Sequence, residues 1–419
     1  MFNEITIEAV MKSENLEEAY RSVKRNGGKP GVDGMSTVDL KAHFQKYRET
    51  ICSKVLEGTY QPAAIKEQKI PKDNGGIRTL GIPTVLDRTI QKAINLVIEP
   101  IFEGGFSDTS YGFRPNRGAH DALRKAQEYV LAGKRWVVDI DLKSFFDQVN
   151  HDRLMTMIGR KVRDKKILAL IAKYLKAPMQ KGDGTKEKRN EGTPQGGPLS
   201  PLLANIYLDP LDKELEKRGL SFVRYADDIA IYVSSQRSAE RILESLVKWI
   251  KKELKLEVNL EKSKTGPVRE SALLGFRLND AGRIGISPKA LSKLEEEVRE
   301  LWEARRNMTS QDLRTAWRQY IIGWWNYFKL ADRRHVLVAL GSWIRRHMRK
   351  CFWLRWHNRK GRKNALKRLG IKGRSLDLSS SSRGAWRIAR SLIMHTALSK
   401  KTLNQYGYIM PWELAEAVK

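Results

Sequence analysis

Residues 222–233 read Phe-Val-Arg-Tyr-Ala-Asp-Asp-Ile-Ala-Ile-Tyr-Val, with two adjacent carboxylates between two short apolar runs. Runs rich in Val, Ile, Tyr and Phe are typical of β-strands. The stretch therefore predicts a hairpin that carries Asp227 and Asp228 at its tip. An ordinary surface turn is the alternative, because Asp is common in turns. Two like charges at one turn repel each other, however, and a bound cation relieves that repulsion.

A second apolar run carries further carboxylates. Residues 136–147 read Trp-Val-Val-Asp-Ile-Asp-Leu-Lys-Ser-Phe-Phe-Asp. Side chains two positions apart on a strand share a face, so Asp139 and Asp141 point the same way and either can hold a metal. A solvated pair at a strand edge is the alternative. Oxygen ligands on rigid strands suit Mg²⁺. Two such ions lower the barrier to in-line attack of a 3′ hydroxyl on a phosphate.

The overall charge points to a polyanionic partner. The chain has 419 residues, 41% of them hydrophobic, and a formal net charge of +30. This length predicts two to four domains, and nucleic acid is the usual partner of so basic a chain. A membrane surface is the alternative, but no long apolar span or basic amphipathic anchor stands out. Two cysteines, Cys52 and Cys351, cannot form a zinc cluster, and no secretory signal is evident, so we expect a cytoplasmic protein without a membrane partner.

The character of the chain changes along its length. From residue 136 to about 283 strand and helix patterns alternate, which predicts an α/β core with hairpins. After residue 287 only helical patterns remain, and residues 333–376 contain fifteen Lys or Arg and no Asp or Glu. In the helix predicted around residues 343–353, apolar side chains share one face. The other faces carry cations that we expect to bind phosphates: Arg345, Arg346, Arg349 and Lys350.

Three segments suit a nucleotide. Lys72 and Arg78 flank a Gly-Gly turn, and a hairpin with two cations can close over a triphosphate. Gln195, in Thr-Pro-Gln-Gly-Gly, has neighbours that allow close backbone approach to a base pair or sugar edge. Phe146 follows Asp141 by five residues, and its ring would exclude a ribose 2′ hydroxyl by steric rejection. The alternative for Lys72 and Arg78 is solvated surface charge. For Gln195 it is a loop that caps a helix, and for Phe146 it is packing in the core.

In this order and spacing the motifs resemble the bacterial group II intron-encoded reverse transcriptases, also called maturases, over nearly the whole chain. Besides the two carboxylate segments, the resemblance is carried by Gly31-Val32-Asp33-Gly34, Ile70-Pro71-Lys72, Arg78-Thr79-Leu80-Gly81-Ile82-Pro83-Thr84, Tyr111-Gly112-Phe113-Arg114-Pro115, Val149-Asn150-His151-Asp152, Thr193-Pro194-Gln195-Gly196-Gly197, Val258-Asn259-Leu260-Glu261-Lys262-Ser263-Lys264, Leu274-Gly275-Phe276 and Gly323-Trp324-Trp325-Asn326-Tyr327-Phe328.

The resemblance implies an α/β (α+β) right-hand polymerase with fingers and palm, then an all-helical thumb and a basic maturase/DNA-binding appendage. The implied domains are an N-terminal extension at 1–60, reverse transcriptase fingers and palm at 61–284, a helical thumb/maturase region at 285–360 and a basic DNA-binding region at 361–419. The family often carries a C-terminal endonuclease with paired cysteines and histidines. This sequence has no such cluster, so we expect an endonuclease-lacking type.

The resemblance also implies residue roles. Asp141, Asp227 and Asp228 would be catalytic and would hold two Mg²⁺ ions. The residues expected to bind the deoxynucleoside triphosphate are Lys72, Arg78, Phe146, Gln195 and Ala226. Those expected to form the primer grip are Leu274, Gly275 and Phe276. Arg114 would join Arg345, Arg346, Arg349 and Lys350 in binding nucleic acid.

The implied function is that of an RNA-directed DNA polymerase encoded by a mobile group II intron, which also assists intron RNA splicing and retrohoming. Its partners would be the intron RNA, an RNA template with a DNA primer, target DNA and deoxynucleoside triphosphates. It would act in the bacterial cytoplasm at the nucleoid. Three alternatives remain: a splicing factor without polymerase activity, a reverse transcriptase recruited to phage defence or DNA repair, and an RNA-dependent RNA polymerase.

Overall fold

The computed structural model of the protein describes residues 5–71, 75–304, 307–332 and 334–415. The chain divides into two compact units, unit 1 at Met1–Pro267 and unit 2 at Val268–Lys419. Within the described residues, none of the helices combines the length and the apolar character that crossing a membrane requires.

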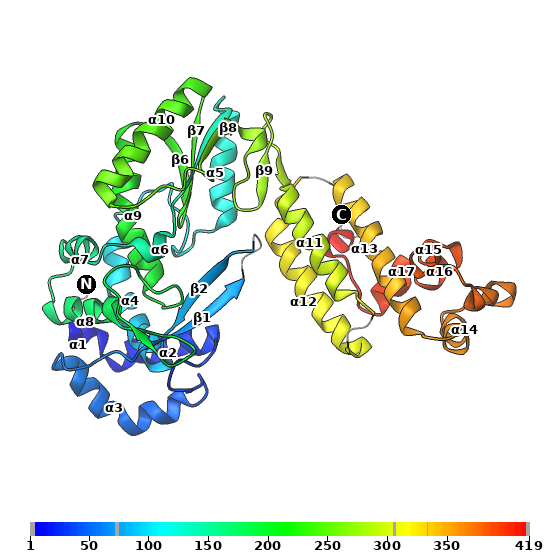
Figure 1. Ribbon diagram of the computed structural model, residues 1–419, viewed down its shortest axis with the longest axis horizontal. Helices are drawn as coiled ribbons and strands as arrows, with labels where there is room; N and C mark the ends of the chain where they lie inside the picture. Colours follow the sequence, from blue (N-terminus) through cyan, green and yellow to red (C-terminus); the bar gives the residue numbers. More distant parts are fainter. Residues whose placement is uncertain (1–4, 72–74, 305–306, 333, 416–419) are drawn as a thin grey trace. The chain divides into compact units, whose positions relative to one another are not determined.

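A four-stranded antiparallel sheet forms the centre of unit 1. Its strands run in the order β6-β7-β3-β8, with bounds β3 Trp136–Asp141, β6 Ser221–Tyr225, β7 Asp228–Val233 and β8 Lys264–Pro267. Three helices pack against the sheet: α5 Ala119–Leu131, α9 Ser200–Lys217 and α10 Gln236–Trp249 (Figure 1). Every residue of β7 after Asp228 is buried. The predicted α/β core and the hairpin around Asp227 are confirmed.

A second, smaller sheet in unit 1 has the order β2-β1-β4-β5. Its strands are β1 Ile65–Pro71, β2 Ile77–Ile82, β4 Met179–Gln180 and β5 Lys186–Glu187. β1 and β2 form an antiparallel hairpin, whereas β1 and β4 run parallel. The predicted β1–β2 hairpin is thus confirmed, while Lys72 lies outside the described residues.

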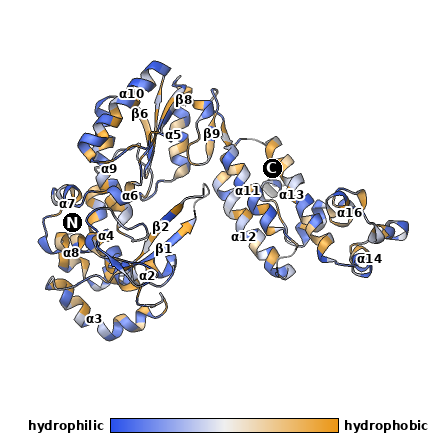
Figure 2. Ribbon diagram, viewed as in Figure 1, coloured by the Kyte–Doolittle hydropathy of each residue, from blue (hydrophilic) through white to orange (hydrophobic). Residues whose placement is uncertain are grey.

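The other helices of unit 1 surround a large apolar core. They are α1 Ile7–Val10, α2 Ser13–Asn26, α3 Leu40–Leu56, α4 Val85–Glu103, α6 Phe145–Gln148, α7 His151–Gly159, α8 Lys165–Lys176 and the π-helix η1 Ile250–Leu254. Hydrophobic and hydrophilic residues alternate along α3 and α10 (Figure 2), as expected where one helix face meets the core. In α4, Ile90, Ile94 and Ile98 are completely buried. This periodic burial fixes α4 at the centre of the unit.

Among the residues of unit 2 that the structure describes, there is one small β-hairpin near the start, and the other elements are helices. The hairpin joins β9 Phe276–Leu278 to β10 Ile284–Ile286. The helices are the 3-10 helix η2 Val268–Glu270, α11 Pro288–Leu301, α12 Ser310–Phe328, α13 Arg334–Arg355, α14 Arg359–Arg368, the 3-10 helix η3 Gly373–Ser380, α15 Ala385–Ile388, α16 Leu392–Ala397, α17 Lys400–Gln405 and α18 Pro411–Ala415.

One tryptophan-rich core joins the helices of unit 2. Trp302, Trp317 and Trp353 are each no more than 1% exposed, and Trp412 near the end of the chain belongs to the same cluster. The core therefore continues across residue 360, where the sequence placed a domain boundary. Residues 268–284, assigned from the sequence to fingers and palm, belong to unit 2.

Candidate active site

The backbone brings the three predicted catalytic carboxylates to one end of the large sheet. Asp141, the last residue of β3, is the register partner of Asp228, the first residue of β7. Residues directly opposite each other on antiparallel strands point to the same face, with Cβ atoms about 5 Å apart. Asp228 also pairs with Tyr225 of β6, which leaves Ala226 and Asp227 as a two-residue turn between them. Asp227 therefore adjoins the opposed pair.

The turn before Asp227 has an uncommon backbone. Ala226 has φ 58°, in the left-handed region, which costs a residue with a side chain roughly 1 kcal/mol or more. Two-residue hairpin turns favour positive φ because their twist then matches that of the strands. Gly112 lies directly against this turn, and a Cβ atom added to it would be 2.2 Å from the Ala226 nitrogen. Only glycine fits at residue 112 while the turn keeps this position.

Electrostatic crowding marks this end of the sheet. Part of the Asp228 side chain is exposed, yet the loss of water around it is the main reason that its pKa is raised to about 6. The carboxylates that add to this shift are those of Asp227, Asp141 and Asp139. The pKa of Asp227 is also raised, chiefly by burial, although the positive charge of Arg78 opposes the shift. A cation bound among these groups would relieve their repulsion.

The donor set suits Mg²⁺. Carboxylate oxygens on strand ends leave positions for water and substrate phosphates, which Mg²⁺ prefers to keep. In the described part of the chain, no three Asp, Glu, His or Cys side chains are already gathered as a metal-binding cluster. The Asp141 carboxylate instead lies 3.9 Å from the Lys262 ammonium. The described structure thus places the three aspartates near one another without gathering their carboxylates into a ready metal-binding cluster.

The segment that follows η1 fixes the backbone at the end of β3. The Asp141 amide donates to the Ser263 hydroxyl at 2.9 Å, and the Asn259 amide donates to the Asp141 carbonyl at 2.8 Å. The Asp141 side chain is 39% exposed. The main chain of Asp141 is thus anchored while its carboxylate stays accessible.

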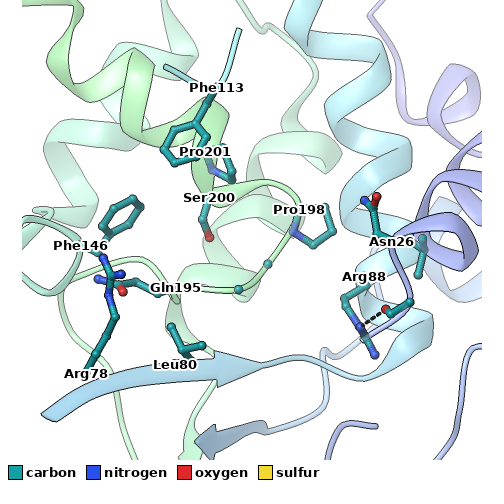
Figure 3. Close-up of a pocket in the computed structure, with 14 residues that line it drawn as sticks. Asn26, Arg78, Leu80, Arg88, Phe113, Phe146, Gln195, Pro198, Ser200 and Pro201 are labelled. Carbon is teal, nitrogen blue, oxygen red and sulfur yellow. Dashed lines mark hydrogen bonds between the residues drawn. The ribbon is translucent and has the colours of Figure 1, made fainter. Parts of the chain in front are cut away.

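A pocket of about 500 Å³ in unit 1 gathers three of the predicted substrate-binding residues. Arg78 of β2, Phe146 of α6 and Gln195 all line it (Figure 3). The Phe146 side chain is only 9% exposed and meets the ring of Phe145 edge-on, with ring centroids 5.2 Å apart. Its position is therefore set by packing on one side while the pocket lies on another. Ala226, the remaining described member of the predicted set, is buried in its turn and is not among the lining residues.

The loop that carries Gln195 is attached to both sides of the pocket. The Gly81 amide of β2 donates to the Gln195 carbonyl at 2.9 Å, and the Thr193 amide donates to the Phe146 carbonyl at 2.7 Å. A Cβ atom on Gly196 would lie 2.5 Å from the Gly81 carbonyl oxygen. Glycine at 196 is thus needed for close packing of the loop on β2.

The opposite side of the pocket contains Arg88, which sequence reasoning missed. Its guanidinium donates to the Gly27 carbonyl at 3.1 Å (dashed line in Figure 3) and to the Lys29 carbonyl at 2.8 Å. These two bonds tie the glycine-rich loop at residues 26–34 to α4. A Cβ atom on Gly28 would lie 2.8 Å from Arg88. Four glycines at 26–34 permit close approach of the backbone, but the sequence does not identify the residue that it approaches.

Arg114 does not have the predicted role in binding nucleic acid. It is 7% exposed, its guanidinium forms a 2.7 Å ion pair with Glu103, and it donates to the Ser110 carbonyl at 2.9 Å. These protein partners consume its donors, so this prediction is wrong. Arg114 instead stabilises the loop that precedes Gly112.

Two of the four cations predicted on α13 also face the protein. Arg345 pairs with Glu413 at 2.6 Å, and Arg349 is 5% exposed and donates to the Leu398 carbonyl. The prediction that these two bind nucleic acid is wrong, because the C-terminal segments cover that side of α13. Arg346 stacks on the Trp386 ring at 3.7 Å and, like Lys350, is partly exposed. For these two the prediction stays open.

The predicted primer grip forms a tight turn within unit 2. Leu274 has φ 52° and Gly275 has φ 80°. The Tyr327 hydroxyl of α12 donates to the Leu274 carbonyl at 3.0 Å. Phe276 is completely buried and contacts the Phe328 ring, with centroids 5.0 Å apart. Phe276 therefore anchors the turn by packing, and the primer-grip role of Leu274, Gly275 and Phe276 stays a prediction.

Comparison with known proteins agrees with these features. Residues 70–278 match the family described as "Reverse transcriptase (RNA-dependent DNA polymerase)". Residues 291–370 match the family described as "Group II intron, maturase-specific domain". The first match contains all three aspartates and the described residues of the pocket's β2 side; the second contains α12, α13 and α14.

Curated relatives extend the comparison. Protein YkfC of Escherichia coli (strain K12) is 34% identical over 310 residues, which cover 64% of this chain and 81% of the relative. Group II intron-encoded protein LtrA of Lactococcus lactis subsp. cremoris is 38% identical over 207 residues, or 49% of this chain. The chain spans only 34% of the length of LtrA. Among solved structures, a partial Cas6-RT-Cas1--Cas2 complex is 25% identical with a TM-score of 0.38, over 61% of this chain and 43% of that one.

The reverse transcriptase match and the maturase match lie in succession along one chain, and a relative is matched over four-fifths of its length. The palm-like sheet with its aspartate pair and the helical region that follows fit the same assignment. The chain belongs to the group II intron-encoded reverse transcriptases, RNA-directed DNA polymerases of the right-hand fold that also carry a maturase domain.

Proposed function

We propose that Asp141, Asp227 and Asp228 hold two Mg²⁺ ions during attack of a primer 3′ hydroxyl on the α-phosphate of a deoxynucleoside triphosphate, with pyrophosphate as the leaving group. The register that sets Asp141 opposite Asp228, beside the turn of Asp227, is the observation that carries this proposal. Bound there, the ions would supply activation of the hydroxyl and neutralisation of phosphate charge.

The pocket residues provide a site for the nucleotide. Arg78 is exposed at the pocket, and its planar fork is suited to two phosphate oxygens at once. The ring of Phe146, which lines the pocket, would exclude a ribose 2′ hydroxyl, and Gln195 would contact the nascent base pair. Their shared pocket supports selection of deoxynucleotides before the reaction.

The helix α14 provides a surface for nucleic acid in unit 2. Lys363 lies four residues after Arg359, three after Lys360 and four before Lys367, so these exposed cations are neighbours on the helix, and the exposed Arg368 follows Lys367. The surrounding residues 333–376 contain no acidic side chain, so this surface suits a phosphate backbone. We infer that it binds group II intron RNA or target DNA, in place of the buried side of α13.

Such a protein would stabilise its folded intron RNA, assist splicing, and copy the RNA into DNA at the target site during retrohoming. Its work would take place in the bacterial cytoplasm, at the nucleoid. The match of residues 291–370 to a maturase-specific domain favours this role over phage defence or DNA repair.

The proposal is tested with a DNA primer annealed to an RNA template, in Mg²⁺, with either deoxynucleotides or ribonucleotides. We expect extension with deoxynucleotides, and faster splicing of the cognate intron RNA in a parallel reaction. Extension that requires ribonucleotides would identify an RNA polymerase instead. Accelerated splicing without any DNA synthesis would identify a splicing factor and contradict the proposed chemistry.

A further inference from the structure

A buried ion pair lies beneath the turn that carries Asp227. Arg224 of β6 and Asp212 of α9 both have completely buried side chains. Two parallel bonds join them, from Nε to one carboxylate oxygen at 2.7 Å and from Nη2 to the other at 2.5 Å. Replacing such a pair by apolar residues is often neutral or stabilising. Stability alone therefore does not account for charges at this position.

The remaining guanidinium nitrogen reaches the turn itself. Arg224 Nη1 donates to the Ala226 carbonyl at 3.0 Å and to the Asn205 side-chain oxygen at 2.9 Å. Asn205 in turn donates to the Gly112 carbonyl at 2.9 Å. Asn205 and Asp212 are seven residues apart on α9, two helical turns, and so share the face that meets Arg224. One helix face thus orients the fork of Arg224.

The main chain holds the same turn from its other side. The Arg224 amide donates to the Thr109 carbonyl at 2.9 Å, and the Tyr111 amide donates to the Arg224 carbonyl at 2.8 Å. This pairing brings Gly112 against the nitrogen of Ala226. A left-handed residue other than glycine persists where its surroundings determine it from several directions, and Ala226 has such surroundings.

The chemistry of arginine explains why this position is not lysine. A guanidinium has donors in a rigid planar fork, so it can bind both oxygens of Asp212 and still reach a carbonyl. An ammonium is a point charge and would satisfy the carboxylate without directing a donor at Ala226. The carbonyl of Ala226 belongs to the peptide bond that leads into Asp227, so fixing it fixes the backbone from which that carboxylate projects.

We propose that Arg224, oriented by Asp212 and Asn205, is a positioning residue that holds the Ala226–Asp227 turn in the conformation required for polymerisation. The inference rests on the proposed role of Asp227. It means that polymerisation also requires buried residues that touch neither nucleotide nor primer. It predicts that the turn is ordered whether or not substrate is bound.

The principal test is the double variant Arg224→Met/Asp212→Leu, which removes both charges together and leaves no unpaired ion. Hydrogen–deuterium exchange of the 225–228 amides reports the turn directly, and primer extension gives kcat and KM. We expect a folded protein whose 225–228 amides exchange at least about tenfold faster. We expect kcat to fall about thirtyfold or more, with KM for the primer–template within about threefold of wild type, because the turn acts after binding.

The matched control is Arg218→Met/Glu214→Leu, which removes a 2.7 Å ion pair at the C-terminal end of α9, where the two side chains are 29% and 19% exposed. Exchange at 225–228 and kcat should both stay at the wild-type values. If the principal variant does not fold, Arg224→Lys retains the buried charge and should show the same faster exchange and lower kcat. Gly112→Ala should also give faster exchange at 225–228 and lower kcat, because its added Cβ atom would displace the nitrogen of Ala226.

A folded Arg224→Met/Asp212→Leu or Arg224→Lys protein with wild-type exchange at 225–228 and wild-type kcat would overturn the inference. The exchange measurement separates this failure from failure of the proposed function. A wild-type protein without polymerase activity contradicts the proposed function, while the exchange rates of the same variants still decide whether Arg224 orders the turn.

Discussion

Asp141 and Asp228 face each other across two antiparallel strands, as direct register partners at the ends of β3 and β7. Like charges opposite each other weaken a sheet. Two backbone hydrogen bonds resist this repulsion: the Asp141 amide donates to the Ser263 hydroxyl, and the Asp141 carbonyl accepts from the Asn259 amide. The strands thus hold two carboxylates together at a cost that a bound cation would offset.

This cost makes stability depend on pH. The folded-state pKa of Asp228 is about 6, above the ordinary value of about 3.9. The folded protein therefore binds this proton more tightly than the unfolded chain, so the associated stability is present below about pH 4 and is lost as pH rises to about 6. In EDTA, Asp228→Asn should match wild type near pH 4 and have a progressively higher Tm up to about pH 6.

The measurement is thermal unfolding between pH 4 and 8, with Asp183→Asn in the exposed turn between β4 and β5 as control. The Tm of the control should not rise above that of wild type as the pH increases from 4 to 6. Added Mg²⁺ should raise the Tm of wild type more than that of Asp228→Asn. A Tm difference that is constant across this pH range would contradict the crowding of carboxylates.

The ring of Phe146 should set the preference for deoxynucleotides. Phe146→Ala removes a ring that lines the pocket and should raise the relative use of ribonucleotides about tenfold or more, a size typical of steric discrimination by one side chain. Phe146→Tyr keeps the ring and should retain the wild-type preference. Competition between the two nucleotide classes in primer extension measures this. Equal discrimination by wild type and Phe146→Ala would assign the ring to packing alone.

The exposed face of α14 should contribute charge to RNA binding. Lys363→Ala/Lys367→Ala removes two exposed cations of α14 and should weaken intron RNA binding, with the slope of log affinity against log salt smaller by about 1.5 to 2. Primer extension on a short template should change little. Filter binding at several salt concentrations measures the slope.

The control for α14 is Arg299→Ala/Lys400→Ala, because these two cations of unit 2 already have acidic partners in Glu295 and Glu413. Its salt slope should stay close to that of wild type. An unchanged slope in the α14 variant would place the RNA contact elsewhere.

The sequence predicted the elements that depend on local pattern. β3, β6 and β7 follow from apolar runs, and the aspartates at their ends follow from the same segments. Helical periodicity runs through residues 151–177 of the sequence, but the structure has two helices there, α7 and α8, because Asp164 caps a new helix by accepting from the amides of Lys166 and Ile167. The apolar run at 273–278 of the sequence forms only the short strand β9, since Leu274 and Gly275 form a turn.

The sequence did not predict which cations are buried, because their burial depends on partners that lie far away along the chain. Arg345 looks like a surface charge until Glu413, 68 positions later, is placed beside it. Arg88 becomes a pocket residue only when the loop at 26–34 lies on α4. In a chain with 78 basic residues, local pattern does not separate those that bind phosphates from those that bind carbonyls.

Primer extension by Asp227→Ala tests the central claim most directly, with a DNA primer on an RNA template in Mg²⁺ and Asp183→Ala as control. We expect no detectable DNA product from Asp227→Ala, RNA binding close to that of wild type, and full activity of the control. DNA synthesis by Asp227→Ala at the wild-type rate would contradict the assignment of the aspartates at the ends of β3 and β7 to catalysis.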